Sequence, residues 1–500
     1  MTKNLLHLTK SKYVSGLRCE RKLWLDVHDH GPYVDPPLGS VMDIGNRVGR
    51  GAHELFPGGI EIEAAPWEHG FAVEQTKCLM EDEETPAIFE GAFEYNGIRI
   101  RVDVLERLGH KVWGLREVKS SLSVKEESGH FDDVAVQFYV LRGCGVKVPS
   151  VELIHINKQF VRGEPGIVWS ELLVRADVLL EAEECSQNIK GAVTNQMAIL
   201  ARSEAPDVYP GKHLCQRPYK CNYWSHCTAG KPDDWINYLP AVRKNQIDRF
   251  REDGIETICS IPENTTLSKT HQVVREVMQT GKPFISENLC TALLALGPPA
   301  YYLDFETVSP IIPIYPGTRP TERIPFQWSV HHLGSGGRLS HFEYLADGDT
   351  DPRRKVAEKL LKALGSDKTP ILAYNAVFER SVIQNLADYF KDLAPKLKAL
   401  VPRVVDLLPI VRSNTYYPGY KGSFSLKSVA PALIPELSYD TLSGVAGGLE
   451  ASAAFWSIAA GIVTDSRKID GLRGELLEYC QLDTEALMKV HLELRKLAKV

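Results

Sequence analysis

The sequence predicts an α/β protein built from two modules and a small helical connector. At roughly 150 residues per domain, a chain of 500 residues has a prior of about three domains. Segments with the two-residue periodicity of strands occur together with segments of helical periodicity near both ends of the chain. A polar stretch with two short helical patterns lies between them. We therefore place the modules at residues 1–240 and 287–500 and the connector at residues 241–286.

The composition is that of an ordinary globular protein. Hydrophobic residues make up 44% of the chain and charged residues 24%, which excludes a disordered, collagen-like or disulfide-rich chain as the main interpretation. The longest apolar stretches are shorter than the roughly 18 residues that span a bilayer. The N-terminal segment lacks the long apolar core and cleavage site of a secretory signal. We expect a cytoplasmic protein that does not bind membranes.

A hairpin and a third strand are expected in the first module. In FEGAFEYNGIRIRVDVLER, the Asn96-Gly97 pair is a strong hairpin signal and places Asp103 on the second strand. In the next strand, VWGLREVKSS, Glu117 and Lys119 are two residues apart and project to one face. The two carboxylates can hold Mg²⁺ or Mn²⁺, and the lysine can orient or deprotonate an attacking water. By itself, the pattern also fits a solvated Glu-Lys pair on a strand surface.

The motifs of this module occur in an order that resembles the RecB-like branch of the PD-(D/E)XK nuclease superfamily, which includes CRISPR-associated single-strand exonucleases. The opening LTKSKYVSGLRCERKLWL is similar to the entry helix of that branch. The resemblance implies a restriction-endonuclease-like α/β core, with His53 as a metal ligand and Gln137 as a catalytic residue. The relatives carry Q-x3-Y, whereas here Gln137 is followed by Leu141. The motif residues are His53, Asp103, Glu117-x-Lys119 and Gln137.

Ten cysteines are too few for a disulfide framework in a chain of this length. Cys215, Cys221 and Cys227 lie close together in the sequence, and Cys19 stands near its start. Four thiolates suit an iron–sulfur cluster or a zinc ion, and free thiols are the third alternative. The RecB-like relatives hold a [4Fe–4S] cluster with one early and three late cysteines, so the resemblance implies this cluster, with zinc as the alternative. The relatives have C-x2-C-x5-C where this chain has C-x5-C-x5-C.

A short helix is expected at the start of the connector. In KNQIDRFREDGIETICSI, apolar residues recur at helical spacing, and Gly254 is typical of a helix end. The next part of the connector is polar and contains a second helical pattern.

A buried strand with an acidic pair opens the second module. In AYYLDFET, Asp304 and Glu306 lie on one face of an apolar strand, where two carboxylates are costly unless something binds them. Two more strands, PFQWSVHHL and LSHFEYL, and a strand that runs into a helix, ILAYNAVFERSVI, follow. In the amphipathic helix LLEYCQLDTEALMKVHLEL, Tyr479 and Asp483 are four apart and share a face. Taken separately, these motifs also fit a surface acidic pair and an ordinary helix face.

Taken in order, D-x-E, N-x-x-F-E and Y-x3-D resemble the DnaQ-like (DEDD) 3′–5′ exonucleases, which have a ribonuclease-H-like fold. In that family, four carboxylates hold two metal ions at the scissile phosphate, and a Tyr or His orients the water. The resemblance implies that Tyr479 orients the water, and that Glu379 stands where the family usually has Asp. The four implied metal ligands are Asp304, Glu306, Glu379 and Asp483.

The combination of the two modules resembles an uncharacterised bacterial family of nuclease-like proteins over nearly the whole chain. It implies a Mg²⁺- or Mn²⁺-dependent nuclease that hydrolyses DNA, single strands above all, in repair, recombination or defence. A nucleic-acid-binding scaffold with one or both centres inactive and an RNA-processing nuclease are the alternatives. DNA is favoured over RNA because no feature reads the 2′-hydroxyl. The net charge of −6 neither indicates nor excludes a nucleic-acid partner, and protein partners are not predicted.

Overall fold

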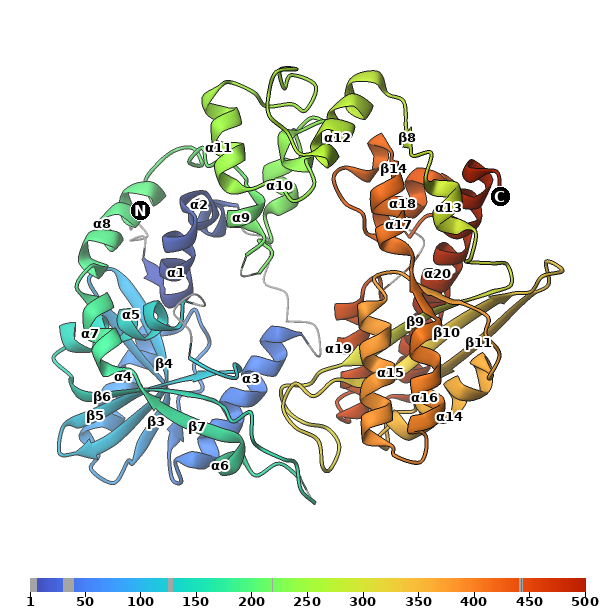
Figure 1. Cartoon of the computed structure of the whole chain (residues 1–500). Helices are drawn as coiled ribbons and strands as arrows, with labels where there is room; N and C mark the ends of the chain where they lie inside the picture. Colours follow the sequence, from blue (N-terminus) through green and yellow to red (C-terminus); the bar gives the residue numbers. More distant parts are fainter. Residues whose placement is uncertain are drawn as a thin grey trace. The chain divides into compact units, whose positions relative to one another are not determined.

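The computed structural model has the mixed α/β architecture that the sequence predicts. It describes residues 7–29, 40–124, 129–164, 166–217, 219–439, 442 and 444–500. The chain divides into two compact units (Figure 1). Unit 1 comprises Met1–Thr228 and Pro310–Glu322, and unit 2 comprises Ala229–Ser309 and Arg323–Val500. The predicted connector, residues 241–286, falls within unit 2.

Unit 1 contains a seven-stranded sheet whose order is β2-β3-β4-β5-β6-β7, with β1 paired to β4. The expected hairpin is confirmed, because β3 and β4 are antiparallel and Asn96 and Gly97 between them have φ of 49° and 75°. In the antiparallel pair β4–β5, Val104 faces Arg116, so the next step puts Asp103 beside Glu117. The strands are β1 (Leu8–Thr9), β2 (Ile60–Glu61), β3 (Ala87–Tyr95), β4 (Ile98–Gly109), β5 (Val112–Lys119), β6 (Lys147–Ile156) and β7 (Leu173–Asp177).

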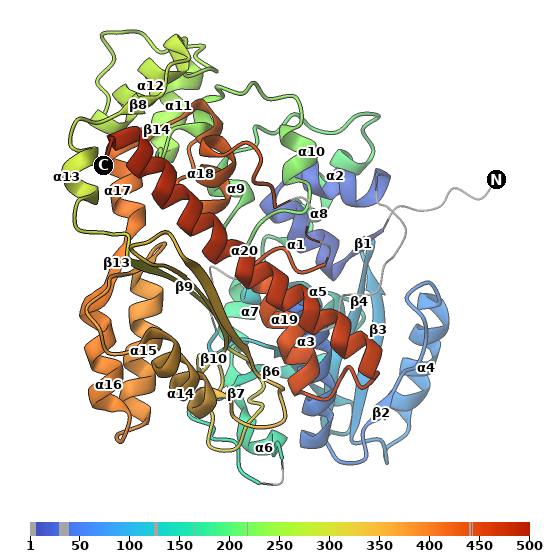
Figure 2. The same ribbon diagram turned by 90° about the vertical axis from the view of Figure 1, so that its right-hand side faces the viewer.

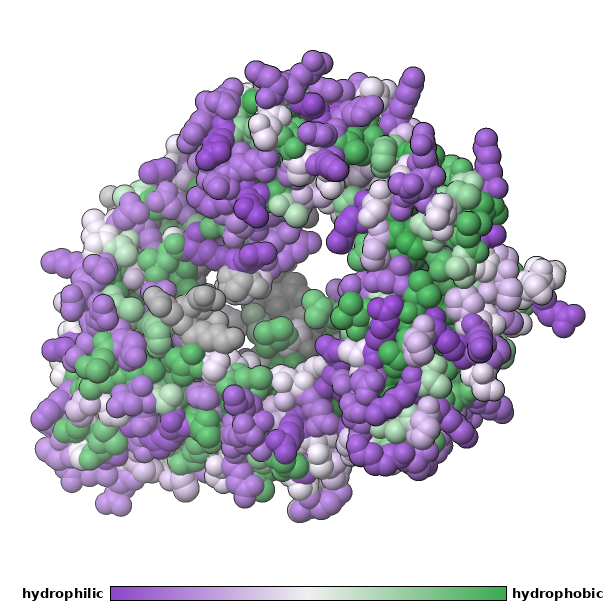
Figure 3. Space-filling model, viewed as in Figure 1, coloured by the Kyte–Doolittle hydropathy of each residue, from purple (hydrophilic) through white to green (hydrophobic). Residues whose placement is uncertain are grey.

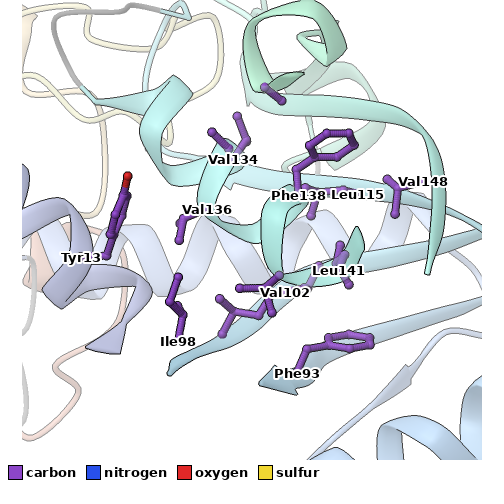
Figure 4. Packing of buried hydrophobic residues seen from close by; sticks show 14 of the residues in the cluster. Tyr13, Phe93, Ile98, Val102, Leu115, Val134, Val136, Phe138, Leu141 and Val148 are labelled. Atoms are coloured by element: carbon purple, nitrogen blue, oxygen red, sulfur yellow. The ribbon is translucent and has the colours of Figure 1, made fainter. Parts of the chain in front are cut away.

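Helices cover this sheet on two sides. Figure 4 shows part of the larger core, in which Val134, Phe138 and Leu141 of α5 lie over Val102 and Leu115 of the sheet. A second buried cluster packs α3 against the sheet. The helices of unit 1 are α1 (Lys10–Arg18), α2 (Glu20–His28), α3 (Val41–Ala52), η1 (His53–Leu55), α4 (His69–Glu81), α5 (His130–Gly143), α6 (Trp169–Leu172), α7 (Leu179–Ser186), α8 (Ile189–Leu200), α9 (Lys212–Cys215) and α10 (Trp224–Thr228).

Unit 2 contains a five-stranded sheet of order β11-β10-β9-β12-β13. Its central strand, β9 (Ala300–Val308), pairs antiparallel with β10 (Ile324–Leu333) and parallel with β12 (Ile371–Ala373). The strands predicted from the apolar segments of the second module are thus confirmed. The remaining strands are β11 (Leu339–Leu345), β13 (Val404–Asp406) and the separate pair β8 (Phe284–Ile285) and β14 (Thr415–Tyr416).

The two faces of β9 differ because side chains alternate along a strand. Tyr301, Leu303 and Phe305 belong to a buried core with α14 (Arg353–Leu364), α15 (Val377–Tyr389) and α16 (Ala394–Leu400). The opposite face carries the acidic pair and is covered by α19 (Gly448–Ala459) and α20 (Ser466–Ala498), the long helix in Figure 2. The remaining helices are η3 (Ile236–Tyr238), α11 (Lys244–Glu252), α12 (Lys269–Thr280), α13 (Leu289–Leu293), η4 (Val401–Arg403), α17 (Leu407–Asn414), η5 (Pro418–Tyr420) and α18 (Leu426–Leu433).

The helical predictions for unit 2 are confirmed, including the second helical pattern of the connector, which is α12, and the helix after the strand of ILAYNAVFERSVI, which is α15. The predicted amphipathic helix is part of α20, and the helix predicted for the start of the connector is α11, after which Gly254 has a φ of 71°. In the described part of the chain, no helix combines the length and the apolar character that crossing a bilayer requires.

Candidate functional site

Three carboxylates of unit 2 meet at one point. Asp304 and Glu306 come from β9 and Asp483 comes from α20, and one oxygen from each lies within 4.8 Å of the others. Asp304 and Glu306 share a face of β9 because they are two residues apart, and α20 packs on that face. We call these three residues the acidic triad.

The acidic triad is short of positive charge. Burial, and then Asp483, raise the pKa of Glu306 to about 8. Burial and the neighbouring carboxylates raise the pKa of Asp304 well above its usual range. The pKa of Asp483 is raised by burial as well, although Lys427 acts in the opposite direction. Carboxylates of this kind favour protonation or a bound cation, and hard oxygen ligands suit Mg²⁺ or Mn²⁺.

Glu379 lies near the acidic triad but is not among the three carboxylates that converge within 4.8 Å. It is 2% exposed, and its Oε2 has no hydrogen-bond partner in the described structure. Burial and Asp406 raise its pKa to about 8, and its own charge contributes to the raised pKa values of Asp304 and Glu306. An unpaired buried oxygen is costly. A cation at the triad would offset the repulsion among its carboxylates and the repulsion between them and Glu379. The residues therefore fit a metal ion.

Hydroxyl groups hold Asp483 in place. The Tyr439 hydroxyl donates to Asp483 Oδ1 over 2.8 Å, and the Tyr479 hydroxyl also hydrogen-bonds this carboxylate. Burial, followed by Asp483, raises the pKa of Tyr479, so its hydroxyl stays protonated. Lys427 Nζ lies 4.7 Å from the ring centroid of Tyr479 and 5.4 Å from that of Tyr439. Tyr439 was not predicted, because no motif connects its segment with the triad.

A cavity of about 430 Å³ opens onto the triad. Asp304 and Asp483 line it together with residues of the segment that precedes α18. The buried Cys480 lies beside the triad, with Sγ 3.7 Å from Asp304 Oδ2. The lining residues are Asp304, Tyr374, Asn375, Leu408, Arg412, Phe424, Ser425, Leu426, Lys427 and Asp483.

In unit 1, the structure brings together four of the predicted residues. Val118 N donates to Asp103 Oδ2 over 2.8 Å, which fixes this carboxylate beside β5. Glu117 accepts from Gln137 Nε2 over 2.7 Å and from Lys119 Nζ over 2.8 Å. Lys119 also forms an ion pair with Asp133 on α5. These four predicted residues and Asp133 form what we call the unit 1 centre.

A second lysine, Lys10, completes the unit 1 centre and was not predicted. Its Nζ lies 2.8 Å and 3.0 Å from the two carboxylate oxygens of Glu117 and 3.9 Å from Asp103 Oδ1. Burial opposes ionisation of Glu117, but Lys10 and Lys119 outweigh it and lower its pKa to about 2. Burial and Glu117 raise the pKa of Asp103 to about 7. An ammonium group thus lies between two carboxylates that were predicted to hold a metal ion.

The position of Lys10 depends on contacts between distant segments. Lys10 begins α1 directly after β1, and β1 is held in place by the parallel pairing of Leu8 with Ile98 on β4. Glu90, another acidic residue that was not predicted, lies on β3 with a φ of 58°. Burial raises the pKa of Glu90, and Lys10 is the first charge that counters this rise.

His53 has other neighbours than expected. It begins the short 3-10 helix η1, directly after α3. Its ring stacks on Phe89 with 3.7 Å between centroids, and its Nδ1 lies 3.9 Å from Glu61 Oε2. Burial lowers the pKa of His53. Among the described residues, no hydrogen bond or ion pair connects His53 with the carboxylates of the unit 1 centre.

The four predicted cysteines surround one small cavity. Cys19 ends α1 and begins α2, Cys215 and Cys227 lie on α9 and α10, and Cys221 lies between these two helices. Burial, and then the other three sulfurs, raise the pKa of Cys215 to about 11. Within the described ranges, no three of these sulfurs lie within 4.8 Å of one another. Four thiolates around one cavity suit either a zinc ion or an iron–sulfur cluster.

A comparison with protein families gives a match to part of the chain. A family model described as "Domain of unknown function (DUF2779)" matches residues 301–425. This range begins on β9 and includes Asp304, Glu306 and Glu379, but not Asp483 on α20. No curated protein matches the chain. Over this quarter of its length, the chain is similar to the DUF2779 domain.

Proposed function

We propose that unit 2 is a metal-dependent nuclease module that hydrolyses phosphodiester bonds at the acidic triad. The single observation that carries this proposal is the convergence of Asp304, Glu306 and Asp483 within 4.8 Å without an ion-paired lysine or arginine among the described residues. Carboxylate oxygens of this kind hold Mg²⁺ or Mn²⁺, and the bound ion offsets the charge that develops on a phosphate under attack. The strand order with β9 at the centre supports a ribonuclease-H-like module of the DnaQ-like type.

The residues of the triad and those around it have separate roles in this proposal. Asp304, Glu306 and Asp483 hold the cation, and Glu379 supplies a further carboxylate close to it. The Tyr479 hydroxyl donates to Asp483 and keeps a lone pair free to accept a hydrogen bond from the attacking water. Lys427, at the wall of the same cavity, is suited to contact a phosphate oxygen. Single-stranded DNA is the proposed substrate, with 3′ ends as the site of attack.

For unit 1, we propose a RecB-like PD-(D/E)XK module in which a divalent cation displaces Lys10 from the unit 1 centre. The adjacency of Asp103 and Glu117 beside Lys119 and Gln137 supports this assignment. We further propose that the four cysteines, which surround one small cavity, hold a [4Fe–4S] cluster, with zinc as the alternative. The cluster would tie the start of unit 1 to the segment that carries α9 and α10.

A nuclease assay tests the proposal directly. The full chain is incubated with end-labelled single-stranded DNA in Mn²⁺, alongside the variants Asp304→Ala and Asp103→Ala. We expect Asp304→Ala to remove the release of nucleotides from 3′ ends, and Asp103→Ala to remove a separate share of the cleavage. Cleavage by the double variant at the parental rate would refute both assignments. A matched RNA strand in the same buffer distinguishes the DNA nuclease from an RNA-processing enzyme.

A second candidate function is favoured by Lys10. Because Lys10 already bonds both oxygens of Glu117, the unit 1 centre can be a strand-binding module without turnover. This candidate predicts salt-sensitive binding of single strands by the chain and no loss of cleavage in Asp103→Ala. Measuring binding and cleavage in the same metal buffer separates the two candidates.

A further inference from the structure

Unit 2 contains a second cavity next to the one at the triad. Its volume is about 660 Å³, and it shares Arg412 and Phe424 with the triad cavity as lining residues. The rest of its wall comes mainly from α11, α12 and the segments before them, the region predicted as a connector. The lining residues are Pro240, Ala241, Arg243, Gln246, Ser268, Thr270, His271, Arg412, Gly422 and Phe424.

The charge of this cavity is opposite to that of the triad. Arg243 and Arg412 line it, whereas none of its lining residues is acidic. Neither arginine forms an ion pair with a carboxylate in the described part of the chain, and Arg412 lies 5.7 Å from the ring centroid of Phe424. Figure 3 shows that the surface over α11 is mostly hydrophilic. Two guanidinium groups that form no ion pair with a described carboxylate are suited to bind phosphate.

A helix terminus faces the same cavity. Ser268, Thr270 and His271 lie at the start of α12, a helix of 12 residues, and Ser268 Oγ accepts from His271 N as its N-cap. The first turn of a helix carries free N–H groups and partial positive charge, which favour anions. The cap uses one of these N–H groups, and the others remain available to a ligand at this end of the cavity.

A buried polar atom without a partner provides an independent indication of a ligand. His271 is 7% exposed, and its Nε2 lies 2.8 Å from the carbonyl oxygen of Pro240. Since a carbonyl only accepts, Nε2 carries the proton of the neutral ring. The other ring nitrogen, Nδ1, is buried and has no hydrogen-bond partner in the described structure. Nδ1 accepts a hydrogen bond when the ring is neutral and donates one when the ring is protonated, and His271 is among the residues that line the cavity.

We propose that this second cavity binds a backbone phosphate of the nucleic-acid strand whose end lies at the acidic triad. The inference rests on the proposed function and extends it, since it gives the helices before β9 a part in holding the substrate. Arg243, Arg412 and the N-terminus of α12 receive the phosphate, and His271, when its ring is protonated, donates from Nδ1 to a phosphate oxygen. The strand passes Arg412 and Phe424, which form the wall shared by the two cavities.

The test compares Arg243→Ala with Arg249→Ala in the full chain. Both arginines are exposed and belong to α11 or its N-cap, but only Arg243 lines the cavity. Binding of a fluorescein-labelled oligothymidylate is measured by anisotropy in Ca²⁺ at several salt concentrations, with thymidine monophosphate as the short ligand. We expect Arg243→Ala to weaken binding of the oligonucleotide about tenfold and to reduce its salt slope by about 0.7. Arg249→Ala should bind it like the parent, and Arg243→Ala should bind the mononucleotide like the parent.

The outcomes separate this inference from the proposed function. Equal oligonucleotide affinity of Arg243→Ala and Arg249→Ala overturns the phosphate site, even if the parent cleaves DNA. A parent that binds the strand through Arg243 but releases no nucleotides in Mn²⁺ retains the site and refutes the nuclease assignment. If inorganic phosphate displaces the oligonucleotide as effectively as unlabelled strand does, the assignment to a strand is overturned. That result would indicate a site for a free anion.

Discussion

The two carboxylate centres of this chain contain similar residue types in opposite electrostatic states. In the unit 1 centre, Lys10 and Lys119 both lie 2.8 Å from Glu117 and lower its pKa to about 2. In the acidic triad, burial and mutual repulsion raise the pKa of Glu306 to about 8. Lys10 and Lys119 form ion pairs with the first centre, whereas no described lysine or arginine forms an ion pair with the acidic triad. A carboxylate motif therefore does not by itself define a metal site, because the lysines that reach it decide how strongly it attracts a metal.

The largest effect should come from removing Lys10, one of the two ammonium groups of the unit 1 centre. Lys10→Met leaves the buried Glu117 with one ion-pair partner fewer, and we expect it to lower the free energy of unfolding by about 3 kcal/mol. Urea denaturation in metal-free buffer measures this change. Lys12→Met, on the same helix, is the control and should change stability by less than about 0.5 kcal/mol. Equal stability of the two variants would mean that Lys10 does not neutralise this centre.

Metal binding should stabilise the chain mainly through the acidic triad. At about 100 times its dissociation constant, Mn²⁺ should raise the free energy of unfolding by about 2.7 kcal/mol. Asp304→Asn should lose this gain and, without metal, should be more stable than the parent, because it removes one of the repelling carboxylates. Thermal unfolding with Mn²⁺ and with EDTA measures both effects. If Asp304→Asn gains as much stability from Mn²⁺ as the parent, the triad is not the binding site.

The raised pKa values make stability depend on pH in a predictable direction. Glu306 and Glu379 ordinarily titrate near 4.5 but have pKa values of about 8 here, so between these values the unfolded chain holds fewer protons. The free energy of unfolding without metal should therefore fall as pH rises, by up to about 1.4 kcal/mol per pH unit for each group. Burial lowers the pKa values of His331 and His491 to about 4. Below pH 6.5, these two histidines should therefore make the free energy of unfolding rise with pH.

The window between pH 6.5 and pH 8 thus isolates the carboxyl groups from the two histidines. Denaturation in EDTA across this window should give a falling free energy, with a shallower slope in Glu379→Gln. A rising free energy in the parent would contradict the charge state assigned to the triad.

The smallest effect concerns the hydroxyl that positions Asp483. Tyr439→Phe removes the donor to Asp483 Oδ1 and should lower the free energy of unfolding by about 1 kcal/mol in metal-free buffer. Tyr389→Phe is the matched control, because Tyr389 is 52% exposed on α15 and should tolerate loss of its hydroxyl. A Tyr439→Phe variant as stable as Tyr389→Phe would show that this hydrogen bond contributes nothing measurable.

Local patterns explain which parts of the fold and site the sequence could predict. Alternation along β9 predicts that Asp304 and Glu306 share a face, and a spacing of four on α20 predicts the shared face of Tyr479 and Asp483. The Asn96-Gly97 hairpin is similarly local. Each of these features is encoded within a few neighbouring residues, so one sequence is enough to predict it.

The residues that were missed depend on contacts between distant segments. Lys10 reaches Glu117 because β1 pairs with β4, and Tyr439 reaches Asp483 from a loop without a distinctive pattern. The role of His53 as a metal ligand stays a prediction; in the structure α3 ends before His53 and its ring stacks on Phe89. The periodicity of the sequence does not predict such contacts, because they depend on how the helices and strands pack together.

Calorimetric titration of the full chain with Mn²⁺ tests the central claim, that the triad holds a divalent cation, most directly. The parent and Asp103→Asn should show the same tightest site, because the unit 1 centre already contains Lys10. Asp304→Asn should lose that site. A tightest site that persists in Asp304→Asn and disappears in Asp103→Asn would contradict the account.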